Sequence, residues 1–301
     1  MNTSKSKGFA KLQLMRPANM VTAIADIIAG VAIVGYLDPE VWTSDQLLNI
    51  VLLIISTAGL YSGGIVFNDV FDYEQDKINR PERVLPSGRL TLGQAKSLGI
   101  QLFAVGVFCS FFVSTHSGIV AVGIVLLALV YDKFGKHHTV FGPINMGLCR
   151  GGNLLLGMSI SSFIEAEFLW ICFLPVIFIA AITLTAQKEA KGKNKAAIGL
   201  AMLLDFSIVV SFFLMHEYLN FSLKRAVYFI VIWYGINVYA KSMAILSNEP
   251  KQIMKAVKLG VLSLIPLNAT YVAGFGSITF AILLLCLLPI SLFLAKKFPV
   301  T

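Results

Sequence analysis

The sequence has few charged residues. Asp, Glu, Lys and Arg together make up 13% of the 301 positions, whereas a soluble domain averages about 25%. Hydrophobic residues make up 57%, and the mean hydropathy is +0.80. A chain this apolar would expose too much hydrocarbon to water, which argues against an ordinary soluble domain. The composition indicates an all-α integral membrane protein.

Cysteines are scarce, and several common catalytic motifs are missing. The four cysteines lie inside apolar segments without CxxC spacing, which indicates packed thiols rather than disulfides or a metal site. The chain has no HExxH, P-loop, GxGxxG or GxSxG sequence. Protease, NTPase, dehydrogenase and hydrolase functions therefore have no motif to support them.

Long apolar runs occupy most of the chain. A membrane span needs about 20 apolar residues, and ten segments qualify as candidates. They cover residues 18–37, 48–67, 97–114, 117–131, 140–161, 168–186, 197–215, 226–246, 256–274 and 277–296. The last two are the weakest, because Pro266 and a group of glycines interrupt them. Connections as short as 116–118 and 274–276 predict hairpins between antiparallel helices. Because no connection is long enough for a soluble domain, we expect one domain over residues 1–301, with nine or ten spans.

Basic residues follow a topological pattern. With the N-terminus placed in the cytoplasm, they gather in the cytoplasmic connections and at both ends of the chain, and Lys224 and Arg225 are the exceptions. This is the positive-inside rule. It accounts for the net charge of +8, so we expect no nucleic-acid partner. The predicted partner is the lipid bilayer, in a membrane of the bacterial inner-membrane type.

A cluster of carboxylates lies at the cytoplasmic end of the second predicted span. The sequence there is NDVFDYEQD, residues 68–76. At about 100° per residue, a helix would place Asp69, Asp72 and Asp76 on one side, with Asn68 adjacent. Carboxylates crowded in this way repel one another unless a cation lies between them. Hard oxygen ligands suit Mg²⁺, which proteins hold with a few carboxylates and substrate phosphates. The alternative is a solvated helix end.

A basic loop follows at once, with the sequence KINRPERVLPSGR over residues 77–89. Its Arg, Pro and Gly residues predict a shaped loop that offers guanidinium groups, such as those of Arg80 and Arg83, to phosphate. Topological charge alone would also place basic residues here. The acidic and basic halves together are more specific than either half.

The two motifs resemble the first aspartate-rich motif, NDxxDxxxD, and the adjoining loop of the UbiA superfamily of intramembrane prenyltransferases. Arg16-Pro17 matches the family's motif before the first helix. Tyr131 and Lys136 are similar to its YPxxKR element, and Arg150 and Asn153 lie where its fifth helix lines a cavity. The segments MGLCRGGNLLLG and LGVLSLIPLNATYVAG are also similar to the EboC-like subgroup.

The resemblance implies a fold and a reaction. The fold is a bundle of nine to ten helices around a central cavity. In the reaction, Mg²⁺ assists ionisation of a prenyl diphosphate, and a lipophilic or aromatic acceptor captures the allylic cation. The metal ligands it implies are Asn68, Asp69, Asp72 and Asp76. The implied catalytic residues are Asp69, Asp72, Arg80 and Lys136, and the implied substrate-binding residues are Arg16, Arg83, Tyr131, Arg150 and Asn153.

The sequence departs from the family pattern after the sixth predicted span. A second aspartate pair is expected there, but the loop over residues 187–195 has Glu189 as its one acidic residue, together with four lysines. Glu189 remains a candidate second-site metal ligand. Lys188 and Lys191 are candidates to bind the diphosphate directly, although the lysines would equally serve as topological charges.

Polar residues within the predicted spans mark the interior of the bundle, because facing lipid would be costly. Arg150 needs an anionic partner, which is either a protein carboxylate or the substrate. For Asp26 and Asp205, a structural pair and a place in a functional cavity are both open. We interpret the chain as a membrane prenyltransferase. The alternative is a UbiA-like protein that binds or transports a lipophilic molecule without turnover, which the missing second motif would favour.

Overall fold

The computed structural model describes residues 7–37, 43–136, 138, 140–187 and 194–298. Every secondary-structure element among the described residues is a helix. These are α1 (Lys7–Met15), α2 (Pro17–Ile33), α3 (Ser44–Phe71), α4 (Tyr73–Asn79), α5 (Leu92–Val113), α6 (Thr115–Val130), η2 (Tyr131–Gly135), α7 (Phe141–Met158), α8 (Ala166–Leu169), η3 (Trp170–Phe173), α9 (Leu174–Ala186), α10 (Lys195–Tyr218), α11 (Leu223–Ser247), α12 (Pro250–Leu262), α13 (Leu264–Phe275), α14 (Ile278–Leu285) and α15 (Leu287–Lys297).

The helical architecture of a membrane protein is confirmed. Among the described residues, eight continuous helical segments are long and apolar enough to cross a membrane, and the bent pair α1 and α2 would make a ninth. Helix α7 also runs through the bundle but is more polar, because Asn145, Arg150 and Asn153 lie on its buried face. Large apolar side chains such as Phe108, Phe112 and Leu203 point outwards, as expected for contact with lipid.

The predicted hairpin at 116–118 lies elsewhere. The chain turns at Ser114, whose backbone is extended, and residues 116–118 already belong to α6. The Ser114 hydroxyl accepts a hydrogen bond from the backbone N–H of Ser117 at 3.0 Å. This contact caps the new helix, which begins at Thr115, two residues before the predicted start of the span at residue 117.

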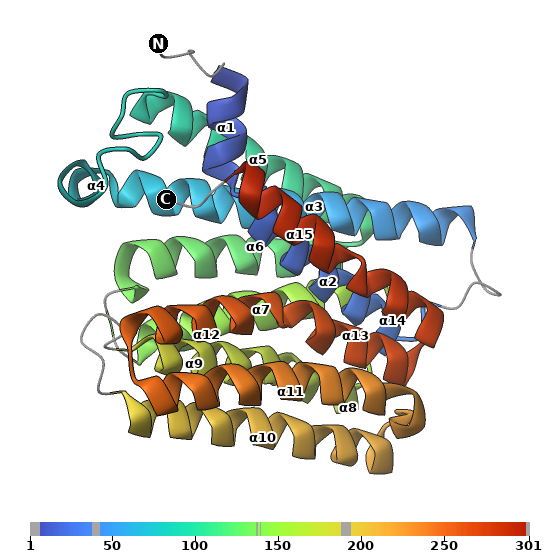
Figure 1. The fold of residues 1–301 in the computed structure, drawn as a ribbon. Helices are drawn as coiled ribbons and strands as arrows, with labels where there is room; N and C mark the ends of the chain where they lie inside the picture. Colours follow the sequence, from blue (N-terminus) through green and yellow to red (C-terminus); the bar gives the residue numbers. More distant parts are fainter. Residues whose placement is uncertain (1–6, 38–42, 137, 139, 188–193, 299–301) are drawn as a thin grey trace.

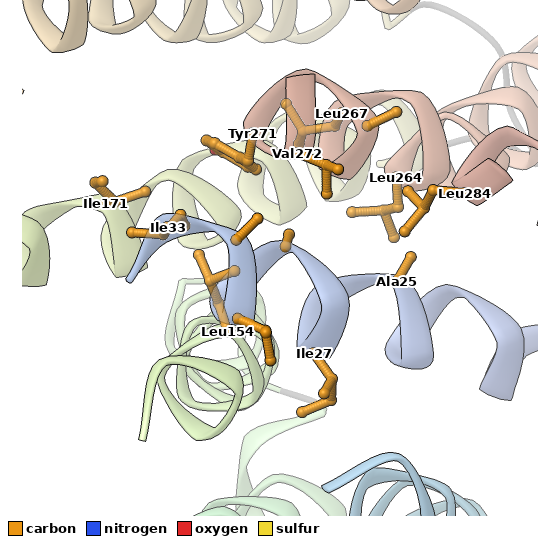
Figure 2. Packing of buried hydrophobic residues seen from close by; sticks show 14 of the residues in the cluster. Ala25, Ile27, Ile33, Leu154, Ile171, Leu264, Leu267, Tyr271, Val272 and Leu284 are labelled. Atoms are coloured by element: carbon orange, nitrogen blue, oxygen red, sulfur yellow. The ribbon is translucent and has the colours of Figure 1, made fainter. Parts of the chain in front are cut away.

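Helix α2 forms the centre of the hydrophobic core. Figure 2 shows its residues, Ile27 among them, between α7 on one side and α13 on the other. Glycines allow α2 and α7 to approach closely, because a Cβ atom on Gly30 would lie 2.3 Å from the Leu154 carbonyl oxygen. One on Gly157 would lie 2.5 Å from the Ile27 carbonyl oxygen. This approach brings the polar residues of α7 against those of α2.

The connections predicted to be cytoplasmic lie at one end of the bundle. In Figure 1, α4, η2, the start of α10 and the turn from α11 to α12 are at the left. The N-terminal helix and the C-terminus meet there, since Phe9 stacks on Phe298 with ring centroids 5.3 Å apart. Arg225, an exception to the charge pattern, lies at the opposite end. It donates a hydrogen bond of 3.0 Å to the Gly274 carbonyl oxygen, so this cation has a local structural role.

Candidate active site

The acidic motif lies on two consecutive helices, α3 and α4, which are separated by one residue. Asn68 and Asp69 lie in the last turn of α3, Asp72 separates α3 from α4, and Asp76 lies within α4. Because α4 continues the helix after this one-residue break, the three aspartates remain on one side. Asp69 and Asp76 are buried, with 7% and 6% of their surface exposed.

Basic side chains of the same chain separate these carboxylates. Arg16 donates from Nη2 to Asp69 Oδ1 at 2.6 Å. Arg83 donates from Nη1 to Asp76 Oδ2 at 2.7 Å and lies 3.8 Å from Asp69 Oδ1. Lys136 pairs with Asp72. The cations that crowded carboxylates require are therefore provided by three segments that are distant in sequence.

Arg16 adopts an unusual backbone conformation. Its φ of 48° and ψ of 64° are left-handed, which costs a non-glycine residue roughly 1–3 kcal/mol. It lies at the 48° bend between α1 and α2, directly before Pro17. At this bend, the guanidinium group of Arg16 reaches Asp69. The strained backbone conformation therefore occurs at a residue whose charged side chain belongs to the site.

The basic loop is anchored by a small apolar cluster. Val84, Leu85 and Leu90 are buried together with Leu14 of α1 and Ala95 of α5. This anchor places Arg83 beside the aspartates. Arg80, in contrast, is exposed at the end of α4. The structure does not bring Arg80 to the aspartates.

A cavity of about 290 Å³ opens beside the acidic motif, between α2, α3, α6 and α7. Of the residues predicted to form the site, Arg16, Asn68, Tyr131, Arg150 and Asn153 line it. The remaining lining residues are Asn19, Thr57, Leu60, Tyr61, Gly64, Ile65, Ile124, Ala128, Asp132, Met146 and Cys149.

Arg150 has a protein partner. It donates from Nη1 to Asp26 Oδ2 at 2.8 Å and from Nη2 to Thr22 Oγ1 at 2.6 Å. Asn153 donates to the same oxygen of Asp26 at 3.0 Å, and Asn268 donates to the other at 2.7 Å. This network makes a polar but charge-compensated wall of the cavity.

Asp205 belongs to a different structural pair. Its carboxylate contacts Lys241 between α10 and α11, and both side chains are buried. Neither residue lines the cavity. Of the two buried aspartates whose roles the sequence left open, Asp26 lies behind the cavity wall, where it binds the lining residues Arg150 and Asn153.

Several lining residues were missed from the sequence. Thr57, Tyr61 and Gly64 precede Asn68 by 11, 7 and 4 residues, so a helical projection backwards from Asn68 would have identified them. Asp132 was also missed, although it follows Tyr131 directly. It occupies the position where the pattern YPxxKR has proline, so the resemblance gives it no role.

The remaining predicted site residues, Glu189, Lys188 and Lys191, lie outside the described residues. Their roles as metal ligand and phosphate-binding groups stay predictions.

The donor set at the mouth of the cavity suits Mg²⁺ only with help from a substrate. Among the described residues, no three His, Cys, Asp or Glu side chains are grouped so that they could hold a metal by themselves. The contact of Asp69 with Arg16 and that of Asp72 with Lys136 each use one carboxylate oxygen, which leaves a second oxygen on each. One or two carboxylates completed by phosphate oxygens is the usual arrangement for Mg²⁺. The residues therefore fit a metal that binds together with a diphosphate.

The fold and this charged mouth define a class of intramembrane protein. Residues 27–299 match the UbiA prenyltransferase family. The chain belongs to this family.

Relatives and solved structures agree with this assignment. The digeranylgeranylglyceryl phosphate synthase of Sulfurisphaera tokodaii is 30% identical over 59% of this chain and 61% of its own length. The chain thus spans about three fifths of that relative. The synthase of the same name from Methanothermobacter thermautotrophicus is 27% identical over 89% of this chain and 96% of its own.

The fold is similar to that of a solved digeranylgeranylglyceryl phosphate synthase, with a TM-score of 0.68 and 22% identity over 89% of this chain and 98% of that one. It is also similar to a UbiA homologue from Archaeoglobus fulgidus bound to GPP and Mg²⁺. There the TM-score is 0.60 at 15% identity, over 87% of this chain and 99% of that one.

Proposed function

We propose that this chain is a membrane prenyltransferase that moves a prenyl group from a prenyl diphosphate to a lipophilic acceptor. The observation that carries the proposal is that a charged site and an apolar cavity lie next to each other. A charged mouth, built from the aspartates and their basic partners, opens directly onto a largely apolar cavity between helices. A prenyl diphosphate has the same division into a charged head and an apolar tail.

The diphosphate would bind at the mouth. Arg16, Arg83 and Lys136 already meet there, and they come from three separate segments. Guanidinium and ammonium groups bind phosphate through charge-assisted hydrogen bonds. As these groups neutralise the negative charge that grows on the departing diphosphate, they lower the barrier to its departure.

Asp69, Asp72 and Asn68 would hold the magnesium ion. When bound, Mg²⁺ neutralises charge on the leaving group. The three basic side chains now paired with the aspartates would then be able to turn toward phosphate oxygens. Mg²⁺ would then replace the basic side chains as the partner of the aspartates, and the basic side chains would pair with the phosphate instead.

The prenyl chain would occupy the cavity. Its walls include Leu60, Ile65 and Ile124, which exclude water from a carbocation that water would otherwise capture. Tyr61 and Tyr131 also line it, and aromatic faces attract cations. Arg150 lies 5.2 Å from the centre of the Tyr61 ring, so a protein cation already fixes the position of this ring.

For the acceptor, we propose a lipophilic molecule with a hydroxyl group. The relatives are named as synthases of digeranylgeranylglyceryl phosphate, which makes a prenylated glyceryl phosphate the first acceptor to test. An aromatic acceptor, as first expected from the sequence, is the second.

We also propose that the site faces the cytoplasm of a cell membrane. The support is the accumulation of basic residues at the end of the bundle that carries the acidic motif, since basic connections remain on the cytoplasmic side. The bacterial origin expected from the sequence stays a prediction.

Product analysis tests the proposal. Purified protein would be incubated with Mg²⁺, labelled farnesyl or geranylgeranyl diphosphate, and either a prenylated glyceryl phosphate or an aromatic acceptor. We expect a labelled lipid in which the prenyl group is joined to the acceptor, and we expect none after chelation of the metal. Binding of the prenyl diphosphate without any product from either acceptor would instead support the non-catalytic carrier.

A further inference from the structure

Asp132 lines the cavity, and one of its two carboxylate oxygens has no hydrogen-bond partner among the described residues. The residue is 3% exposed, and it belongs to the short turn η2 that follows α6. Its Oδ1 accepts a hydrogen bond of 2.9 Å from Asn68 Nδ2. Its Oδ2 is fully buried and has no hydrogen-bond partner among the described residues. A buried carboxylate oxygen without a partner is costly, so such an atom calls for an explanation.

The surrounding charges do not compensate for this group. Among the described residues, four carboxylates gather at the mouth of the cavity, those of Asp69, Asp72, Asp76 and Asp132. The three basic side chains that contact them, Arg16, Arg83 and Lys136, pair with the first three. Asp132 has no salt bridge with a described residue, although it interacts electrostatically with Lys136, Asp72 and Asp69. Of these four described carboxylates, Asp132 is therefore the one that no salt bridge compensates.

The neighbouring residues hold this carboxylate in position. Asn68 uses its amide N–H to fix Oδ1, and its own side-chain oxygen remains available as a ligand. Lys136 lies on the same turn of chain as Asp132 and contacts Asp72. Asn68 and Asp132 are thereby joined at the edge of the cavity, and Asp72 is near enough to interact electrostatically with Asp132. All three side chains carry hard oxygen atoms.

We propose that Asp132 is a direct ligand of a divalent cation at the mouth of the cavity. Its Oδ2 binds the ion, Asn68 orients the carboxylate, and Asp72 contributes a second carboxylate oxygen. Two carboxylates complete the coordination of Mg²⁺ with phosphate oxygens or water. The inference adds a metal ligand to the site of the proposed function. It rests on that function only in taking the phosphate to be the diphosphate of a prenyl substrate.

Metal binding, measured without turnover, tests the assignment. Mn²⁺ is a suitable probe, because its electron paramagnetic resonance signal reports the free ion. Purified protein would be titrated with MnCl₂, alone and with inorganic pyrophosphate. The test variant is Asp132→Asn, whose amide oxygen still accepts the hydrogen bond from Asn68. The matched control is Glu74→Gln, which removes an equal charge from the exposed face of α4.

We expect Asp132→Asn to weaken Mn²⁺ binding by about tenfold or more, because loss of a ligand exceeds the usual effect of a supporting residue. Glu74→Gln should change it less than about twofold, because an exposed charge is screened by solvent. Equal affinity in Asp132→Asn and the wild type, or no Mn²⁺ binding by the wild type with pyrophosphate, would overturn the inference. If Mn²⁺ binds through Asp132 but no prenyl diphosphate is turned over, the proposed function fails and the metal site stands.

Discussion

At the scale of the residue, the charged groups of this chain divide into two sets with different tasks. At the mouth of the cavity, Arg16, Asp72 and Lys136 are partly exposed, so they are able to exchange their partners for a ligand. The pair of Arg150 and Asp26 lies within the bundle. Arg150 also donates a hydrogen bond to Thr22, and Asn153 and Asn268 donate hydrogen bonds to Asp26. This network holds α2, α7 and α13 together, so its first contribution is to stability.

Removing one partner of this pair should be costly. We expect Arg150→Met to destabilise the protein by about 3–5 kcal/mol, because Asp26 would remain buried without its counter-charge. The double variant Asp26→Asn with Arg150→Met should recover much of the loss, since no unpaired charge is then buried. Thermal unfolding in detergent measures both. An unchanged midpoint in the single variant would show that the pair does not support the fold.

Much of the site was predictable from residue types, and the reasons for the misses are physical. The cluster of aspartates and the basic loop are continuous in sequence, so their proximity could be inferred from one helix and one loop. Arg150 was correctly expected to need an anion, but its partner Asp26 lies 124 positions away, and no local pattern encodes such a contact. The place of Asp132 was equally hidden, because its contact with Asn68 joins residues that are 64 positions apart.

At the scale of the element, the close approach of α2 and α7 decides how the cavity is built. These helices carry the network of Asp26 with the lining residues Arg150 and Asn153, and Gly30 and Gly157 permit their contact. Long apolar runs in the sequence predicted that both helices exist. They did not predict which faces meet, because the glycines matter only once two backbones lie against each other.

The variant Gly157→Ala tests this packing. A new Cβ atom would lie 2.5 Å from the Ile27 carbonyl oxygen and 2.9 Å from Ile27 Cα, and a backbone gives way less easily than a side chain. We expect a loss of about 1–3 kcal/mol from overpacking. Gly123→Ala is the control, since nothing lies within 4 Å of its added Cβ. Equal thermal stability of the two variants would show that α2 and α7 can separate without cost.

At the scale of the whole molecule, the apolar segments and the charge pattern predicted most of the helices and the end of the bundle that carries the site. Breaks inside the spans were harder to predict. Helix α14 gives way to α15 at Cys286, within a strongly apolar segment. The break between α12 and α13 at Ser263 lies close to Pro266, which had marked that span as interrupted. Hydropathy measures affinity for lipid and is insensitive to a local change of backbone direction.

The orientation of the molecule is open to direct measurement. Single cysteines would replace Ser44 or Glu74, at opposite ends of the bundle, in a variant without the four native cysteines. An impermeant maleimide applied to intact cells should label position 44 and reach position 74 only after permeabilisation, because the basic end stays in the cytoplasm. Labelling of position 74 alone in intact cells would reverse the proposed orientation.

The central claim is that the acidic motif and a divalent metal together release diphosphate from a prenyl substrate. The most direct measurement is pyrophosphate release from geranylgeranyl diphosphate by purified wild type, Asp72→Asn and Glu74→Gln, with and without Mg²⁺. We predict Mg²⁺-dependent release by the wild type and by Glu74→Gln, and a loss of about 100-fold or more in Asp72→Asn, equivalent to about 2.7 kcal/mol of barrier. Release by Asp72→Asn at nearly the wild-type rate, or wild-type release that is indifferent to metal chelation, would contradict the claim.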